Sequence, residues 1–171
     1  MNLMNCDAQL IEKVQPIAQS KQNSCLFAAA AMLLTWKNKQ SVTEVDVAKQ
    51  AGPPFDIYFD TDTGVPAGEI GKFAIAVGLT PEPIANYSVD AWARMINQHG
   101  PLMVGVDVGT IGNANHIVVV TGMAGDCDDS NQVTGIDPET GAEKTGTFKV
   151  FNRAFEAVAG TNNLRHVILH F

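Results

Sequence analysis

The sequence has few cysteines, few charges and no long apolar run, and each of these shortages excludes a class of protein. Its three cysteines, Cys6, Cys25 and Cys127, are odd in number, widely separated and without a CxxC pair. They make a poor disulfide framework and no cysteine-based metal site, so at least one thiol is expected to be free. No apolar stretch reaches the roughly 18 residues that a membrane span needs, so no membrane span is expected.

Basic residues are also scarce, because 11 lysines and arginines face 18 acidic residues and leave a formal charge of −7. No run of basic residues offers a footprint for a phosphate backbone, which argues against a nucleic-acid partner. Residues 1–15 lack a basic segment followed by an apolar core, so we expect no secretory signal. The protein is expected to be cytoplasmic, or secreted by a route that needs no signal peptide.

What is present is a composition suited to one compact domain over residues 1–171, with 46% hydrophobic and 17% charged residues. The first half is predicted to be mainly helical and the second half mainly extended. Helices are expected over 25–37, 43–50, 66–77, 88–98 and near 150–158, strands over 102–108, 117–121, 133–137 and 165–171, and a loop over 53–64. This order predicts an α+β fold in which a helical N-terminal half, with a central cysteine-bearing helix, packs on an antiparallel C-terminal sheet.

Cys25 is the best candidate for a reactive thiol. It follows the Asn23-Ser24 pair, a plausible N-cap, and opens the apolar run CLFAAAAMLLTWK. The free amides and the dipole at a helix start favour the thiolate, which is the nucleophilic form. Cys127 lies in the acidic loop AGDCDDSN, which disfavours a thiolate, and Cys6 lies in the irregular start of the chain. The simpler interpretation of Cys25 is a small buried residue.

His116 is the candidate base, because it opens the strand HIVVVT after a loop and so can project into a cleft. Asp137 ends the strand 133–137 and would lie beside the imidazole if the two strands pair antiparallel. The simpler interpretations are a histidine capping its strand and an aspartate in an Asp-Pro turn. His166 and His170 alternate along the last strand as structural or surface positions, and His99 suits a helix C-terminus.

Gln19 lies six residues before Cys25 on an extended approach to the helix. From there its amide could face the developing negative charge of an acyl-transfer reaction, together with the backbone N–H of Cys25. Gln22, three residues before Cys25, is a rival for the same role.

Together these segments resemble the papain-like cysteine peptidases, in particular the small bacterial branch with bacteriocin leader peptidases and secreted effector proteases. The matching segments are Q19-SKQNS-C25 with its Ala-rich helix ending in Trp36, GPLMV at 100–104, HIVVVTG at 116–122 and GIDP at 135–138. The family usually has an aromatic residue directly after the nucleophile, whereas this chain has Leu26 followed by Phe27.

The resemblance implies that Cys25 is the nucleophile, His116 the base and then the acid, Asp137 the residue that orients His116, and Gln19 the oxyanion donor. It implies a thiol protease acting on a protein or peptide through a thioester, with no metal or organic cofactor. A bacterial toxin or effector with a cognate immunity or inhibitor protein is the corresponding biological role.

Three alternatives stay open at this stage. The same triad serves peptidoglycan amidases and glutamine deamidases, and a catalytically silent papain-like binding module is the non-enzymatic option. The acidic residues of 126–137 match part of a calcium-loop template, but Asn131 replaces the required glycine and strands flank the segment, so an acidic hairpin loop explains them better.

Overall fold

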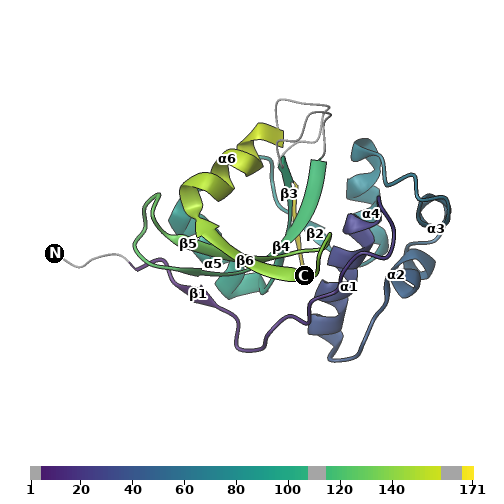
Figure 1. The fold of residues 1–171 in the computed structure, drawn as a ribbon, viewed down its shortest axis with the longest axis horizontal. Coiled ribbons are helices and arrows are strands. Elements are labelled where there is room, and N and C mark those ends of the chain that lie inside the picture. Colours follow the sequence, from purple (N-terminus) through teal and green to yellow (C-terminus); the bar gives the residue numbers. More distant parts are fainter. Residues whose placement is uncertain (1–4, 108–114, 159–166) are drawn as a thin grey trace.

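A helical half and a sheet half lie side by side in this computed structural model, which describes residues 5–107, 115–158 and 167–171 (Figure 1). The helical half holds α1 (Cys25–Asn38), α2 (Glu44–Ala51), α3 (Phe55–Asp60), η1 (Ala67–Glu69) and α4 (Ile70–Ala76). The other half holds α5 (Val89–His99), α6 (Phe148–Val158) and the sheet strands. The predicted α+β class is confirmed, and in the described residues no helix is long and apolar enough to cross a membrane.

Within the described residues, seven strands form one antiparallel sheet in the order β2-β7-β3-β4-β5-β6, and β1 pairs with β4. The strands are β1 (Ala8–Gln9), β2 (Thr80–Pro81), β3 (Leu102–Asp107), β4 (Asn115–Ala124), β5 (Gln132–Asp137), β6 (Ala142–Thr147) and β7 (Ile168–His170). The register of β4 and β5 pairs Val119 with Ile136. This register brings the start of β4 next to the end of β5, where His116 and Asp137 lie.

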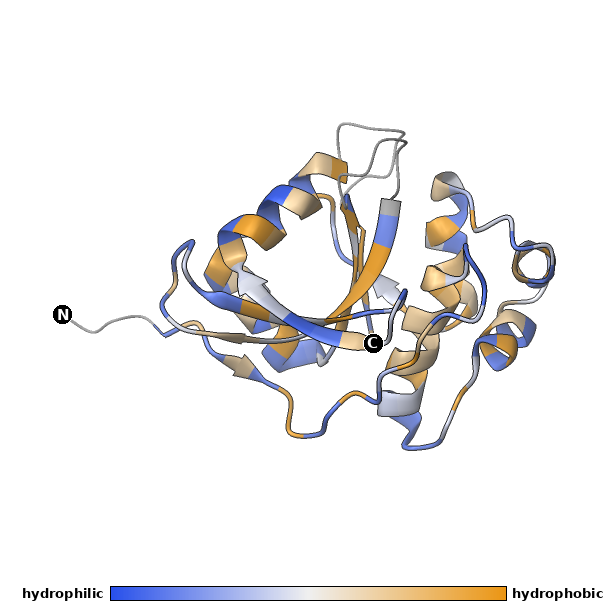
Figure 2. Ribbon diagram, in the orientation of Figure 1, coloured by the Kyte–Doolittle hydropathy of each residue, from blue (hydrophilic) through white to orange (hydrophobic). Residues whose placement is uncertain are grey.

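Both faces of the sheet are buried, because successive side chains of a strand point to opposite faces. Met103, Ile117 and Val119 pack with α1 to α4, whereas Leu102, Val104 and Val120 pack with α5 and α6. Strand β3 is therefore apolar along nearly its whole length (Figure 2). The central strands are thus held between two helical layers.

Helix α1 is buried on every side along most of its length, with Leu26 to Leu34 all inaccessible to solvent. Four consecutive alanines let α2 and the strands β3 and β4 approach its backbone closely, and the helix is apolar all round, as expected of a buried central helix (Figure 2). Because this core surrounds α1, the first residue of the helix has a rigid position.

Two local predictions were wrong. The segment 53–64, predicted as a loop, contains α3, because Phe55 and Phe59 lie one turn apart and both enter the core. Strand β6 was not predicted, because its residues are mostly exposed and polar and it is held by backbone pairing with β5. Of the other predicted strands, Val108 and residues 165–166 lie outside the described residues.

The three cysteines do not behave as their spacing suggested, because Cys6 and Cys127 form a disulfide and Cys25 is free. The two partners are 121 residues apart in sequence, so no local pattern signals their pairing. The Cys6 N–H donates to Gly125 O at 3.0 Å, and Asn5 bridges to Asp126, which brings the N-terminal segment beside the β4–β5 hairpin. The expectation of a free thiol at Cys25 is consistent with this arrangement.

Candidate active site

Cys25 is the first residue of α1, with its thiol free and its side chain partly exposed. The first amides of a helix have no acceptor within the helix. Ser24 occupies the N-cap position but makes no side-chain cap, so its hydroxyl does not neutralise the amides of the first turn. The thiol therefore lies where the helix amides and dipole favour negative charge.

The loop before Cys25 is held by a buried carboxylate that the sequence did not reveal. Glu44, the first residue of α2, is 6% exposed and accepts hydrogen bonds from Ser24 Oγ at 2.6 Å and from the Ser20 N–H at 2.9 Å. These bonds tie residues 20–24 to α2, so the position of Cys25 depends on a residue 20 positions away from Ser24. No local pattern in the sequence signals this contact, because the burial of Glu44 is visible only in the structure.

His116 and Asp137 lie on neighbouring antiparallel strands and point toward one another. The Nε2–H of His116 donates to Asp137 Oδ1 at 2.7 Å, and both side chains are 13% exposed. Because Asp137 occupies Nε2, Nδ1 is the ring nitrogen left for Cys25, whose thiol hydrogen-bonds to the ring. The structure thus brings Cys25, His116 and Asp137 together from a helix and two strands.

The charges of this group follow from its hydrogen bonds. Burial opposes a positive charge on His116, but the hydrogen bonds and charges of Cys25 and Asp137 outweigh it and raise the His116 pKa from 6.5 to about 9. Burial likewise opposes ionisation of Asp137, but hydrogen bonds from Lys144, His116 and the Glu139 N–H lower the Asp137 pKa below its ordinary value. The contacts of Cys25 and Asp137 therefore favour the protonated form of His116.

Lys144 is a member of this group that sequence reasoning missed. Its Nζ lies 2.7 Å from Asp137 Oδ2, so Asp137 binds a histidine through one oxygen and a lysine through the other. Lys144 comes from β6, the strand that was not predicted, and its side chain is 64% exposed. Its contact with Asp137 is set by the register of β5 and β6.

Gln19 lies beside the Asp137 turn, because its backbone N–H donates to Pro138 O at 2.7 Å. Its side-chain Nε2 donates to Lys21 O at 2.9 Å and to Gln22 O at 2.8 Å, and its Oε1 is buried without a partner among the described residues. Both amide protons thus close the loop that precedes Cys25. The rival, Gln22, is exposed and contributes its carbonyl to this loop.

A hollow of about 310 Å³ adjoins the hydrogen-bonded pair of His116 and Asp137. Its lining is mainly apolar and includes Val118 and Val120 of β4 with Val150 and Phe151 of α6. Val150 is 68% exposed, so an apolar surface lies open beside the histidine.

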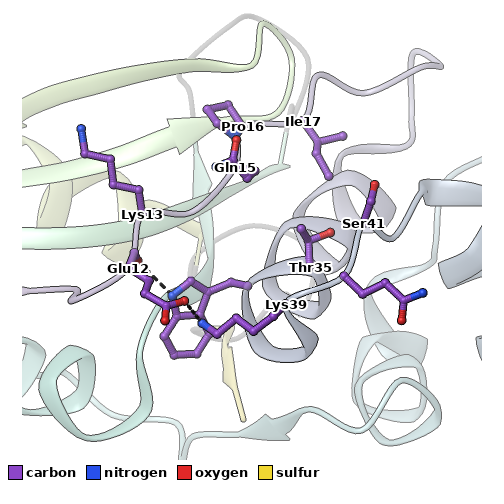
Figure 3. A pocket seen from close by; sticks show the side chains of 10 residues that line it. Glu12, Lys13, Gln15, Pro16, Ile17, Thr35, Lys39 and Ser41 are labelled. Atoms are coloured by element: carbon purple, nitrogen blue, oxygen red, sulfur yellow. Dashed lines mark hydrogen bonds and ion pairs between the residues drawn. The ribbon is translucent and has the colours of Figure 1, made fainter.

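A second hollow, of about 590 Å³, lies between residues 12–17 and the C-terminal end of α1 (Figure 3). Beside it, the Trp36 Nε1–H donates to the backbone oxygen of Glu12 at 3.0 Å, and the Glu12 carboxylate forms an ion pair with Lys39. Neither a cysteine nor a histidine lines it, so it offers no cysteine–histidine pair.

A cysteine at the start of a buried helix, facing a histidine–aspartate pair on an antiparallel sheet, defines the papain-like class of cysteine hydrolases. The chain matches the family model described as papain-like cysteine protease AvrRpt2 over residues 6–156, and it belongs to this family. No curated protein matches the chain. The resemblance found in the sequence is therefore confirmed.

Proposed function

We propose that this protein hydrolyses peptide bonds through a Cys25–His116–Asp137 triad. The observation that carries the proposal is the 2.7 Å bond from His116 Nε2 to Asp137 Oδ1, with Cys25 on the other side of the same ring. Membership in a family of cysteine proteases supports peptide hydrolysis. The raised pKa of His116 supports an imidazolium that stabilises a thiolate at neutral pH.

The reaction would proceed by acyl transfer. The thiolate of Cys25 attacks the peptide carbonyl carbon, and the new C–S bond places a negative charge on the carbonyl oxygen. His116 gives its proton to the leaving amine as the C–N bond breaks, which leaves a thioester on Cys25. Neutral His116 then removes a proton from water, whose oxygen cleaves the thioester and releases the carboxylic acid and the thiolate. No step of this cycle requires a metal or an organic cofactor.

Gln19 is proposed to stabilise the oxyanion together with the backbone N–H of Cys25. Its Nε2 bonds to Lys21 O and Gln22 O, so it would serve by exchanging one of these carbonyls for the oxyanion. A donor of this kind contributes roughly 10²-fold to 10³-fold to the rate.

Two reactions of Cys25 separate this role from a purely structural one. Alkylation by iodoacetamide forms no oxyanion, whereas peptide hydrolysis does. We expect Gln19→Ala to lower kcat for a cleaved peptide by roughly 10²-fold and to change the alkylation rate less than about threefold. An equal loss in both reactions would show that Gln19 only shapes the loop, and Gln22→Ala is the matched control.

The nucleophile is tested first by mass spectrometry of the protein after a short exposure to iodoacetamide. Cys25 is expected to be labelled selectively, and His116→Ala is expected to slow the labelling at neutral pH. Cleavage of a peptide mixture would then distinguish a protease from an amidase or deamidase with the same triad. Selective labelling without any amide hydrolysis would indicate a silent module, and absence of labelling at Cys25 would refute the enzyme.

The biological role is proposed to be that of a bacterial effector or toxin acting on a protein, held in check by a cognate inhibitor protein. Support comes from the family resemblance described above. Expression of the wild-type chain is expected to be toxic in its target cell, and Cys25→Ala is expected to remove this toxicity. Equal growth with both forms in every compartment tested would contradict the proposal.

A further inference from the structure

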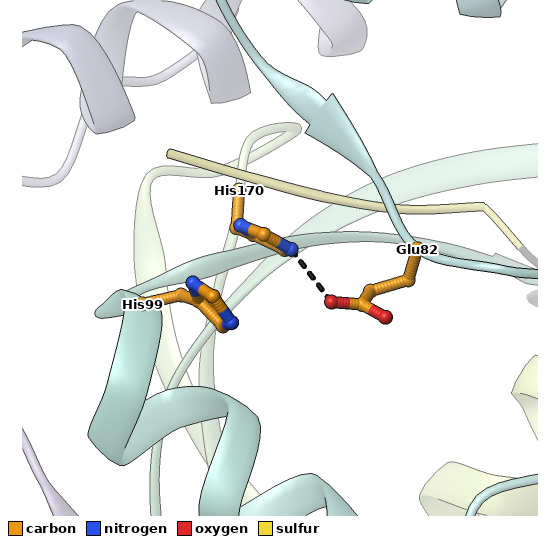
Figure 4. Close-up of side chains that lie close together, drawn as sticks. All are labelled: Glu82, His99 and His170. Atoms are coloured by element: carbon orange, nitrogen blue, oxygen red, sulfur yellow. Dashed lines mark hydrogen bonds and ion pairs between the residues drawn. The ribbon is translucent and has the colours of Figure 1, made fainter.

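A second group of titratable side chains lies outside the triad, where three elements meet. Glu82 directly follows β2, His99 is the last residue of α5 and His170 is the last residue of β7 (Figure 4). Each offers one nitrogen or oxygen atom, and these three atoms all lie within 4.8 Å of one another. The group joins positions as far apart as 88 residues in sequence.

The surrounding backbone holds each of the three side chains in place. The Glu82 N–H donates to Ile168 O at 2.9 Å, which fixes Glu82 against β7. α5 ends at His99 because Gly100 has φ +86, and a Cβ there would lie 2.3 Å from Trp36 Cη2. His170 pairs with Thr80 in the sheet and is 4% exposed.

His170 has two hydrogen-bond partners, and a neutral ring cannot donate to both. Its Nδ1 lies 2.9 Å from Phe171 O, and its Nε2 lies 2.7 Å from Glu82 Oε1. A carbonyl and a carboxylate are both acceptors, whereas a neutral imidazole has a single N–H. If Nδ1–H donates to the carbonyl, the lone pair of Nε2 faces the carboxylate, and either a second ring proton or a bound cation resolves this conflict.

His99 adds a second nitrogen to this position. Its ring stacks on that of His170 with centroids 3.8 Å apart and planes 24° apart. Two imidazolium rings this close would repel one another, so protonating both rings at once is costly. A single divalent cation would supply the charge and would use both nitrogens and the carboxylate as ligands.

We propose that Glu82, His99 and His170 bind a Zn²⁺ ion. Two imidazoles and one carboxylate form a ligand set that zinc uses, with water in the fourth position. The bond from His170 Nδ1 to a backbone carbonyl matches the outer contact that fixes the tautomer of metal-bound histidines.

Zinc ligands lie about 2.0–2.2 Å from the metal, so ligand atoms in a tetrahedral site are about 3.3 Å apart. Binding therefore requires the separation of His170 Nε2 and Glu82 Oε1 to widen from 2.7 Å. It also requires the His99 ring to turn out of the stack about χ2, a torsion with a broad energy profile. His99 and Glu82 are partly exposed, which allows this movement and gives the ion a path from solvent. The ion would tie β2, α5 and β7 together and would take no part in the proposed hydrolysis.

The test uses the full chain with Cys25→Ala and His116→Gln, because His116, Asp137 and Glu139 form another group that could hold a metal ion. Isothermal titration with ZnCl₂ and metal analysis after gel filtration are expected to give about one zinc per chain. His99→Gln and Glu82→Gln are each expected to weaken binding at least about tenfold. The matched control, Glu69→Gln, removes a carboxylate paired with Lys72 and is expected to leave binding unchanged.

Thermal unfolding provides a second measurement. Zinc is expected to raise the Tm of the background protein and to have little effect on the His99→Gln and Glu82→Gln proteins, whose folding is checked by circular dichroism. Absence of zinc binding, or equal binding by all the variants, would overturn the proposal. A Tm that depends on pH but not on zinc would also overturn it, because a proton alone would then supply the charge.

Discussion

Replacing Asp137 by asparagine keeps the shape of the side chain and removes the charge that faces His116. Asp137 and Cys25 are the two partners that raise the His116 pKa from 6.5 to about 9 against the effect of burial. This rise corresponds to roughly 3 kcal/mol in favour of the imidazolium. Because burial opposes the charge, the two partners together contribute more than this net amount.

If Asp137 supplies its share of that free energy, Asp137→Asn should lower the His116 pKa by at least about one pH unit, or about 1.4 kcal/mol. The assay is a ¹⁵N NMR titration of the histidine rings, with the His116 signal assigned from a His116→Gln spectrum. It needs no substrate and reports the imidazolium directly. Hydrolysis of a cleaved peptide should fall by roughly 10² or more, as expected when a catalytic base loses its orientation.

Lys144→Met is the matched control, because it removes the other charge bound to Asp137. The ammonium competes with the imidazolium for the same carboxylate, so its removal should leave the His116 pKa unchanged or raise it slightly. Lys144 is largely exposed, which keeps the effect small. A His116 pKa that stays at about 9 in Asp137→Asn, or that falls equally in Lys144→Met, would refute the reasoning.

Three further predictions concern stability. Because the His116 pKa is higher in the folded chain, the stability that His116 contributes is complete below about pH 6.5 and is lost as the pH rises through about 9. The free energy of unfolding measured in urea should therefore fall by up to about 3 kcal/mol over this range, and His116→Gln should lack this fall. Glu44→Ala should cost about 2–4 kcal/mol and slow alkylation of Cys25, because the buried Ser24 hydroxyl and the Ser20 N–H lose their acceptor. A smaller loss in Glu44→Gln would be consistent with this cause. Removing the disulfide by Cys6→Ala with Cys127→Ala should lower the free energy of unfolding by at most about 5 kcal/mol, as expected for a loop that spans 121 residues. The alkylation rate of Cys25 should not change. A slower rate would show that the segment around Cys6 shapes the site.

Local sequence patterns predicted the elements that carry the proposed triad. The unbroken apolar run after Ser24 predicted α1 and placed Cys25 at its start, where the structure has it. The β-branched run after His116 predicted β4, and the register of β4 and β5 satisfies the condition set for Asp137. These predictions depend on side-chain periodicity and helix-start signals, which are properties of neighbouring residues.

Elements held mainly by distant contacts escaped prediction. Strand β6 is polar and exists through its pairing with β5, and α3 depends on two phenylalanines that enter a core assembled by other helices. The Cys6–Cys127 disulfide had no signal, because three widely spaced cysteines are compatible with several states.

The sequence by itself thus determined the fold class, the family and the candidate nucleophile, because helix and strand periodicity and the motif around Cys25 are written in consecutive residues. Only the tertiary structure decided which partners meet. The bonds of Asp137 to Lys144, of Glu44 to Ser24 and of His170 to Glu82 depend on strand register and helix packing. Such contacts join residues up to 88 positions apart, and their geometry is set by how the elements pack against one another.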